Sequence, residues 1–110
     1  MRFMLIVYGD PTIEDRPMEE WVEFHNKYGA RGVFKIGERL YDVTTATTVR
    51  VREDKVNATD GPFAETKEHL GGIYVIECKD LDEAIQIASE CPGAKTGSME
   101  IRPVFVVPGE

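Results

Sequence analysis

The chain has 110 residues, and 13 Lys and Arg residues against 20 Asp and Glu residues give it a formal net charge of −7. A chain of this length forms one domain, which we expect to span residues 1–110. The contents of 42% hydrophobic and 30% charged residues exclude the disordered and fibrous classes. The acidic balance argues against direct binding of nucleic acid, because that requires a clustered cationic face.

The N-terminus and the cysteines indicate a cytoplasmic protein. The apolar run at residues 3–8 has the length of a strand and is far shorter than the ~20 residues of a membrane span. A Gly-Asp-Pro turn at residues 9–11 ends this run before it reaches the length of a secretory signal. Cys78 and Cys91 lack CxxC spacing, so we interpret both as reduced packing residues.

The first part of the chain predicts a strand, a helix and a second strand. Residues 2–8 are almost continuously apolar, as in a central strand that is covered on both faces. Apolar and aromatic side chains then recur at helical spacing from Met18 to Tyr28, and we expect this helix to end near Gly32. Residues 33–40 are expected to form the next strand.

The rest of the chain predicts a hairpin, a strand, a helix and a closing strand. Asp80, followed three residues later by Glu83, has the pattern of a helix N-cap. The paired glycines at residues 71–72 indicate a bulge or a close backbone approach. The predicted elements are a hairpin of residues 45–52 and 55–59, a buried strand of residues 70–78, a helix from Asp80 to Pro92, and a strand of residues 98–107.

This order of elements predicts an α+β fold of the ferredoxin-like (split βαβ) type with an added β-hairpin. Two helices are enough to cover one face of an antiparallel sheet, so the other face is left without cover. An exposed apolar sheet face of this size usually contacts another subunit. We therefore expect a homodimer in which two sheets pack face to face.

A family resemblance lies in the segment Thr-Asp-Gly-Pro-Phe-Ala-Glu-Thr-Lys-Glu at residues 59–68, which is followed by Leu-Gly-Gly-Ile-Tyr. The chain resembles the DGPF-type subgroup of the YCII-related proteins, whose motif is read here as Asp-Gly-Pro-Phe at residues 60–63. The resemblance implies a dimeric α+β barrel in a family of mostly unassigned role. It also implies that some members lie beside, or are fused to, extracytoplasmic-function sigma factors. Wider relatives resemble small-molecule lyases, such as dehydrochlorinases, that use a His–Asp pair.

The loop at residues 60–68 has two interpretations. In the first it only connects the hairpin to a core strand, with Asp60 accepting backbone hydrogen bonds, Gly61 adopting a positive φ and Phe63 buried. In the second it carries function, because ordered longer loops often do and because a carboxylate beside an ammonium forms an acid–base or anchoring pair. The candidate site residues are then Asp60 for catalysis and Arg39, Phe63, Glu65 and Lys67 for substrate binding. The charges of Glu65 and Lys67 also fit a solvated surface.

His25 also has two interpretations. It lies on the apolar face of the first helix and should point at the sheet, either as a core residue bonded to backbone or a tyrosine, or as a general base. The lyase relatives imply that Asp60 would orient such a base, although the first helix is shorter than in typical members. We expect His69 at the surface. The chain contains no HxxxH, HxH or CxxC spacing, so we expect no metal and no cofactor.

Two functions remain open from the sequence. The first is a small-molecule-binding or cofactor-free lyase- or isomerase-like dimer, with Asp60 and His25 as acid–base residues and Arg39 or Lys67 holding an anion. The second is a non-catalytic interaction or regulatory module associated with sigma-factor-dependent transcription. The acidic balance of the chain suits a protein partner with a basic surface.

Overall fold

The computed structural model describes residues 1–64 and 66–109. The strands are β1 (Arg2–Gly9), β2 (Phe34–Arg39), β3 (Thr47–Arg52), β4 (Lys55–Asp60), β5 (His69–Glu77) and β6 (Ser98–Pro103). The helices are α1 (Met18–Ala30), α2 (Leu81–Glu90) and the single turn α3 (Gly93–Thr96), with a 3₁₀ turn η1 (Val43–Thr45). The predicted α+β, ferredoxin-like order with an added hairpin is confirmed, and α3 and η1 are additions to it.

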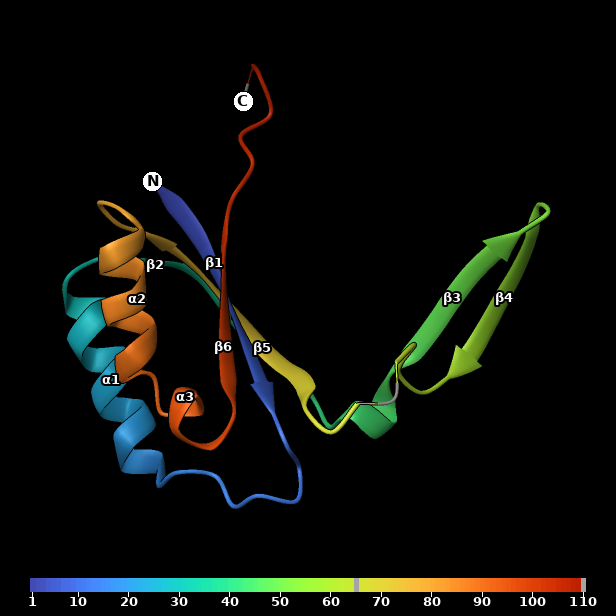
Figure 1. Ribbon diagram of the computed structural model, residues 1–110, viewed down its shortest axis with the longest axis horizontal. Helices are drawn as coiled ribbons and strands as arrows, with labels where there is room; N and C mark the ends of the chain where they lie inside the picture. Colours follow the sequence, from blue (N-terminus) through green and yellow to red (C-terminus); the bar gives the residue numbers. More distant parts are fainter. Residues whose placement is uncertain (65, 110) are drawn as a thin grey trace.

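The main sheet has four strands in the order β2-β5-β1-β6, and every neighbouring pair is antiparallel. Figure 1 shows α1 and α2 together on one side of this sheet. Side chains of a strand alternate between the two faces, so Phe3 and Leu5 of β1 point under the helices, where Ile76 of β5 joins them in the buried core. Met4 and Ile6 belong to the opposite face, which no helix of the described residues covers.

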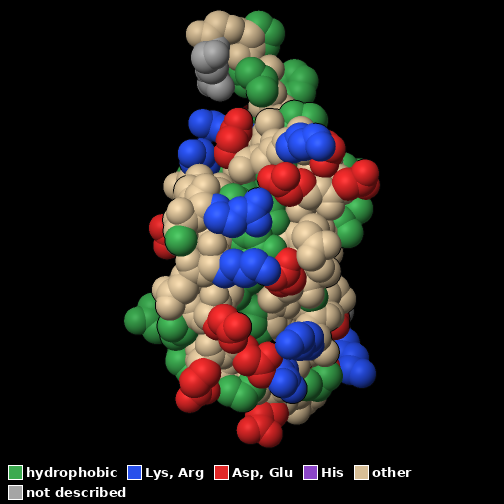
Figure 2. Space-filling view, turned by 90° about the vertical axis from the view of Figure 1, so that its left-hand side faces the viewer, with side chains coloured by type: hydrophobic (Ala, Val, Ile, Leu, Met, Phe, Trp, Pro, Cys, Tyr) green, Lys and Arg blue, Asp and Glu red, His purple; other side chains and the backbone are tan. Residues whose placement is uncertain are grey.

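The two long helices are joined at their outer edge by one carboxylate. α2 begins where predicted, since the Asp80 side chain accepts a hydrogen bond of 3.0 Å from the backbone N–H of Glu83. At the other end of α2, Glu90 accepts hydrogen bonds from Lys27 and from the buried Tyr28, both on α1. Figure 2 shows the outer helical face, on which acidic and basic side chains are interspersed, as on a solvated surface.

A β-bulge interrupts the pairing of β1 with β5. Val7 pairs with Gly72 and Tyr8 pairs with Leu70, so Gly71 has no partner on β1. Gly72 also lies close to β2, because a Cβ atom there would meet the carbonyl oxygen of Glu38 at 2.8 Å. The predicted bulge and close approach at residues 71–72 are both confirmed.

Strands β3 and β4 form a separate two-stranded sheet, which we call the arm (residues 47–60). Its strands are joined by a two-residue turn in which Glu53 and Asp54 have φ values of 52° and 64°. The base of the arm is closed by Gly61, which has a φ of 98° and donates a backbone hydrogen bond of 2.7 Å to Ala46. The arm stands away from the main sheet on the side opposite the helices (Figure 1).

Two sequence predictions are wrong in detail. Phe63 is not buried, since 78% of it is exposed; the loop that carries it lies at the base of the arm and away from the core. The closing strand β6 ends at Pro103 and not at residue 107, because β1 begins at Arg2 and offers no partner beyond that point. The interpretation of Cys78 and Cys91 as buried, reduced cysteines is confirmed.

Candidate functional site

A cavity of about 800 Å³ opens between the first half of α1 and one end of the main sheet. Its walls come from the end of β1 with the loop that follows, the inner face of α1, the end of β2, and the first half of β5. These segments are far apart in the sequence, so the cavity can bring their polar groups together at one place. A shallower depression of about 630 Å³ lies on the outer surface of α1 alone and brings no distant segments together.

The cavity wall includes a histidine–tyrosine pair. His25 of α1 and Tyr74 of β5 face each other, with 2.7 Å between Nε2 of His25 and the hydroxyl oxygen of Tyr74. His25 is exposed, so the interpretation of His25 as a core residue is wrong, but a tyrosine does hold its imidazole, which lines the cavity. Trp21 and Phe34 complete an aromatic wall, with ring centroids 6.2 Å and 6.0 Å from that of His25.

The hydroxyl of Tyr74 is held in its protonated form. Burial is the main cause that raises the pKa of Tyr74, and the nearby Cys91 adds to it while Arg39 opposes it. The ring of Tyr74 is stacked on Phe34, with centroids 5.1 Å apart and planes inclined by 28°. A neutral phenol fixed in this way can donate a hydrogen bond into the cavity at any physiological pH.

Asp10, which the sequence interpretation treated only as a turn residue, is a buried carboxylate of the cavity wall. It is 7% exposed, and its Oδ1 accepts hydrogen bonds from the backbone N–H (2.8 Å) and hydroxyl (2.6 Å) of Thr12. The Thr12 hydroxyl is the largest cause that lowers the pKa of Asp10, and Lys67 adds a smaller effect. Among the described residues, none donates a hydrogen bond to Oδ2. An Asp directly after a buried strand, with Thr two positions later, is the sequence signal that was missed.

The predicted ammonium–carboxylate pair exists with a different carboxylate. The Nζ of Lys67 lies 3.9 Å from Oδ2 of Asp10. Asp60 ends β4 in the arm, where it pairs with Thr47, and it does not line the cavity. Within the part of the chain that the structure describes, no hydrogen bond or ion pair joins Asp60 to His25 or to Lys67.

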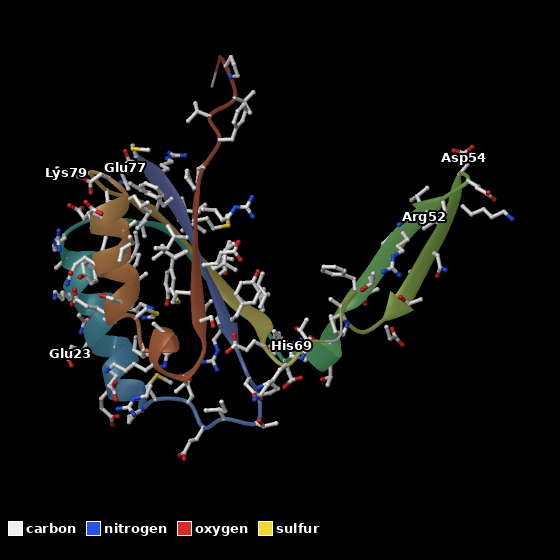
Figure 3. All side chains as sticks on the ribbon, in the orientation of Figure 1. Glu23, Arg52, Asp54, His69, Glu77 and Lys79 are labelled. Carbon is white, nitrogen blue, oxygen red and sulfur yellow. The ribbon has the colours of Figure 1, made fainter. Side chains whose placement is uncertain are left out.

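The remaining predicted site residues are divided between the cavity and the arm. Arg39 lines the cavity, whereas Phe63 is exposed and lies outside it. Glu65 lies outside the described residues. His69 is half-buried in the cavity wall, so the expectation that it lies at the surface is wrong; Figure 3 shows it where β5 adjoins the base of the arm.

Two further observations concern groups of metal-binding side chains and membrane-spanning helices. In residues 1–64 and 66–109, no three His, Cys, Asp or Glu side chains are grouped so that they could hold a metal ion. No helix in the same residues is long and apolar enough to cross a membrane.

The fold and the cavity define a ferredoxin-like α+β protein whose candidate site lies between its first helix and the sheet. The chain matches the model of the YCII-related domain over residues 1–108, and it therefore belongs to the YCII-related family. It is also 36% identical, over 121 aligned residues, to an uncharacterised protein of Rhizobium meliloti (strain 1021). That match covers 100% of this chain and 98% of the relative. The resemblance found in the sequence is thus confirmed for the family.

Proposed function

We propose that this YCII-related protein is a cofactor-free acid–base catalyst, of the lyase or isomerase type, for a small molecule with a planar apolar body and one anionic group. The observation that carries the proposal is the separation of 2.7 Å between His25 Nε2 and the Tyr74 hydroxyl inside an open cavity with aromatic walls. A base within reach of a bound molecule and a proton donor beside it are the two groups that proton transfer requires.

The histidine–tyrosine pair supplies both groups when the imidazole carries its hydrogen on Nε2. That nitrogen then donates to the oxygen of Tyr74, so the phenolic hydrogen is free to bond a substrate oxygen. The other ring nitrogen, Nδ1, keeps its lone pair and serves as the base. When it removes a proton from a carbon beside a carbonyl group, the electron pair of the broken C–H bond moves onto the carbonyl oxygen. Tyr74 stabilises the resulting enolate by its hydrogen bond.

Arg39 and the aromatic wall support the class of substrate. Arg39 lines the cavity and makes no ion pair with any described carboxylate, whereas Arg16, also at the cavity, is bound to Glu20 at 2.6 Å. Arg39 is therefore the guanidinium available for an anionic group. Trp21 and Phe34 offer flat apolar surfaces to the body of the molecule.

Asp10 adds a hydrogen-bond acceptor to the same wall. Its lowered pKa keeps the carboxylate ionised, and its Oδ2 accepts no hydrogen bond from a described residue. A buried acceptor without a partner is costly in free energy, so a donor on a bound molecule would be favoured at this position. We assign to Asp10 the binding of a substrate hydroxyl, and to Lys67 the support of the Asp10 charge.

We also propose that the protein is a homodimer formed through the uncovered face of the main sheet. Met4, Ile6 and Ile73 alternate with core residues and share this face, so it is apolar at its centre. Val75 is buried on the same face without belonging to the helical core cluster. A dimeric α+β barrel, as the family resemblance implies, would bury Met4, Ile6 and Ile73 as well.

The proposed chemistry is tested with phenylpyruvate, which has an aromatic body, a carboxylate and acidic C–H bonds beside a carbonyl group. Exchange of its benzylic hydrogens in deuterated buffer is followed by proton NMR, with and without protein. We expect catalysed exchange, and we expect His25→Gln to lower its rate by about 100-fold or more. Tyr74→Phe should lower it as well, because the enolate loses its donor.

Asn26→Ala is the matched control, because Asn26 follows His25 on α1 but does not line the cavity. Its exchange rate should equal that of the unmodified protein. If catalysed exchange persists in His25→Gln, the assignment of the base is wrong. If neither the unmodified protein nor Asn26→Ala catalyses exchange, and NMR shows no binding of phenylpyruvate at the cavity amides, the non-catalytic interaction module is favoured instead.

A further inference from the structure

The arm has one apolar face and one cationic face. The register pairs Val49 with Ala58 and Val51 with Val56, and side chains of paired residues share a face, so these four line one side of the ribbon, with the pair Thr47 and Asp60 on the same side at its base. The other side carries the alternate residues Thr48, Arg50, Arg52, Lys55, Asn57 and Thr59. Alternation of this kind is typical of an antiparallel sheet that is covered on one face only.

Nothing in the described part of the chain covers the apolar face. Val49, Val51 and Val56 are 60%, 55% and 73% exposed. The arm extends into free space beyond the sheet, and Arg52 and Asp54 mark its distant end in Figure 3. The radius of gyration is accordingly 16.0 Å, against roughly 13 Å for a compact chain of this length. A two-stranded ribbon with an open apolar face is only marginally stable in water, so a covering surface would stabilise it.

The area that a stable dimer needs indicates what the covering surface is. From strand spacing and rise, the uncovered face of the four strands has a projected area of roughly 380 Å². The arm adds roughly 200 Å² by the same measure. In a two-fold dimer each subunit buries its own arm and, outside the sheet face, the surface under its partner's arm. The two arms then add about as much projected area to each subunit's contact as the sheet face supplies, which favours an interface of the size that stable dimers need.

We propose that the arm embraces a second copy of this chain, with its apolar face packed on the partner subunit. This inference rests on the proposed homodimer and adds to it the surface that makes the dimer stable. The position of the arm fits this role, because it extends on the side of the sheet where the partner would lie, opposite the helices (Figure 1). The cationic face then remains in water, where its charges prevent further strands from adding.

The test compares two sets of substitutions on the two faces of the arm. Val49→Thr, Val51→Thr and Val56→Thr are combined, because threonine retains the strand preference and shape of valine while its hydroxyl opposes burial. Sedimentation velocity over a range of concentrations should give a dimer dissociation constant raised by about 100-fold. The control combines Arg50→Thr and Asn57→Thr on the opposite face. It should change the dimer dissociation constant by less than about threefold.

A second measurement does not depend on variants. In a sample mixed from isotopically labelled and unlabelled chains, filtered NOE spectra should show contacts from the methyl groups of Val49, Val51 and Val56 to the partner. If the protein is a dimer that shows no such contacts, and if its dissociation constant is the same in both sets of variants, the proposed role of the arm is wrong and the proposed dimer stands. A protein that is monomeric at NMR concentrations overturns both. Neither result affects the deuterium exchange of phenylpyruvate, which tests the cavity separately.

Discussion

Glu90 is expected to contribute more to stability than any ordinary surface carboxylate, because it ties α2 to α1. Its carboxylate accepts hydrogen bonds from Lys27 and Tyr28 of α1 and, at 2.9 Å, from Gln86 of α2. Lys27 is the largest cause that lowers the pKa of Glu90 to about 2, followed by Tyr28 and Gln86. The side chain is only 28% exposed, so water screens these contacts in part.

The substitution Glu90→Gln removes the charge and leaves an amide oxygen for Tyr28. The fall of the pKa from 4.5 to about 2 corresponds to roughly 3 kcal/mol of preference for the ionised form, which screening reduces to about 2 kcal/mol. We therefore expect the free energy of unfolding of Glu90→Gln at pH 7 to be lower by about 2 kcal/mol.

The dependence on pH has a definite sign. The pKa of Glu90 is lowered in the folded state, so its contribution is fully present above about pH 4.5 and is lost as the pH falls towards 2. Urea unfolding at a series of pH values should show that the unmodified protein and Glu90→Gln approach each other in free energy of unfolding over this range. Glu23→Gln is the control, since Glu23 lies on the outer face of α1 and contacts no described cation. An equal loss in both variants, or a difference that persists at pH 2, would refute the reasoning.

Three further substitutions test backbone geometry. A Cβ atom on Gly97 would lie 2.0 Å from the carbonyl oxygen of Tyr8, so Gly97→Ala should cost about 3 kcal/mol or more in urea unfolding. Gly29→Ala, in α1 with free space around it, should instead stabilise by about 0.5–1 kcal/mol, and a similar loss in both would contradict the steric argument. Asp54→Gly relieves the positive φ of 64° in the turn of the arm and should increase hydrogen-exchange protection of the arm amides, while reduced protection would contradict it.

The fold follows from local patterns that are strong in this sequence. Helical spacing from Met18 to Tyr28 predicts α1, and the N-cap at Asp80 predicts the start of α2. Positive φ at Gly61 and a bulge at Gly71 follow from the glycines themselves. Each of these features depends on residues within about one turn or one hairpin, where propensity and capping decide the outcome.

The site could be predicted only in part, because its contacts are not local. His25 is a candidate from its position on the helix, but its partner Tyr74 lies 49 residues further along the chain. Asp60 is conspicuous in its motif, yet it lies in the arm, while Asp10 forms the buried carboxylate of the cavity. The direction in which the arm leaves the sheet keeps Asp60 out of the cavity, and no periodicity in the sequence encodes that direction.

The unpaired Gly71 determines which side chains of β5 enter the cavity. With the bulge, His69 pairs with Gly9 and lies on the same side of the sheet as Val7 and the helices. If pairing continued without a bulge, Gly71 would stand opposite Tyr8, and His69 would move to the other face. One glycine therefore sets the parity of the strand: it decides whether the ionisable side chain of His69 faces the cavity or the uncovered face of the sheet.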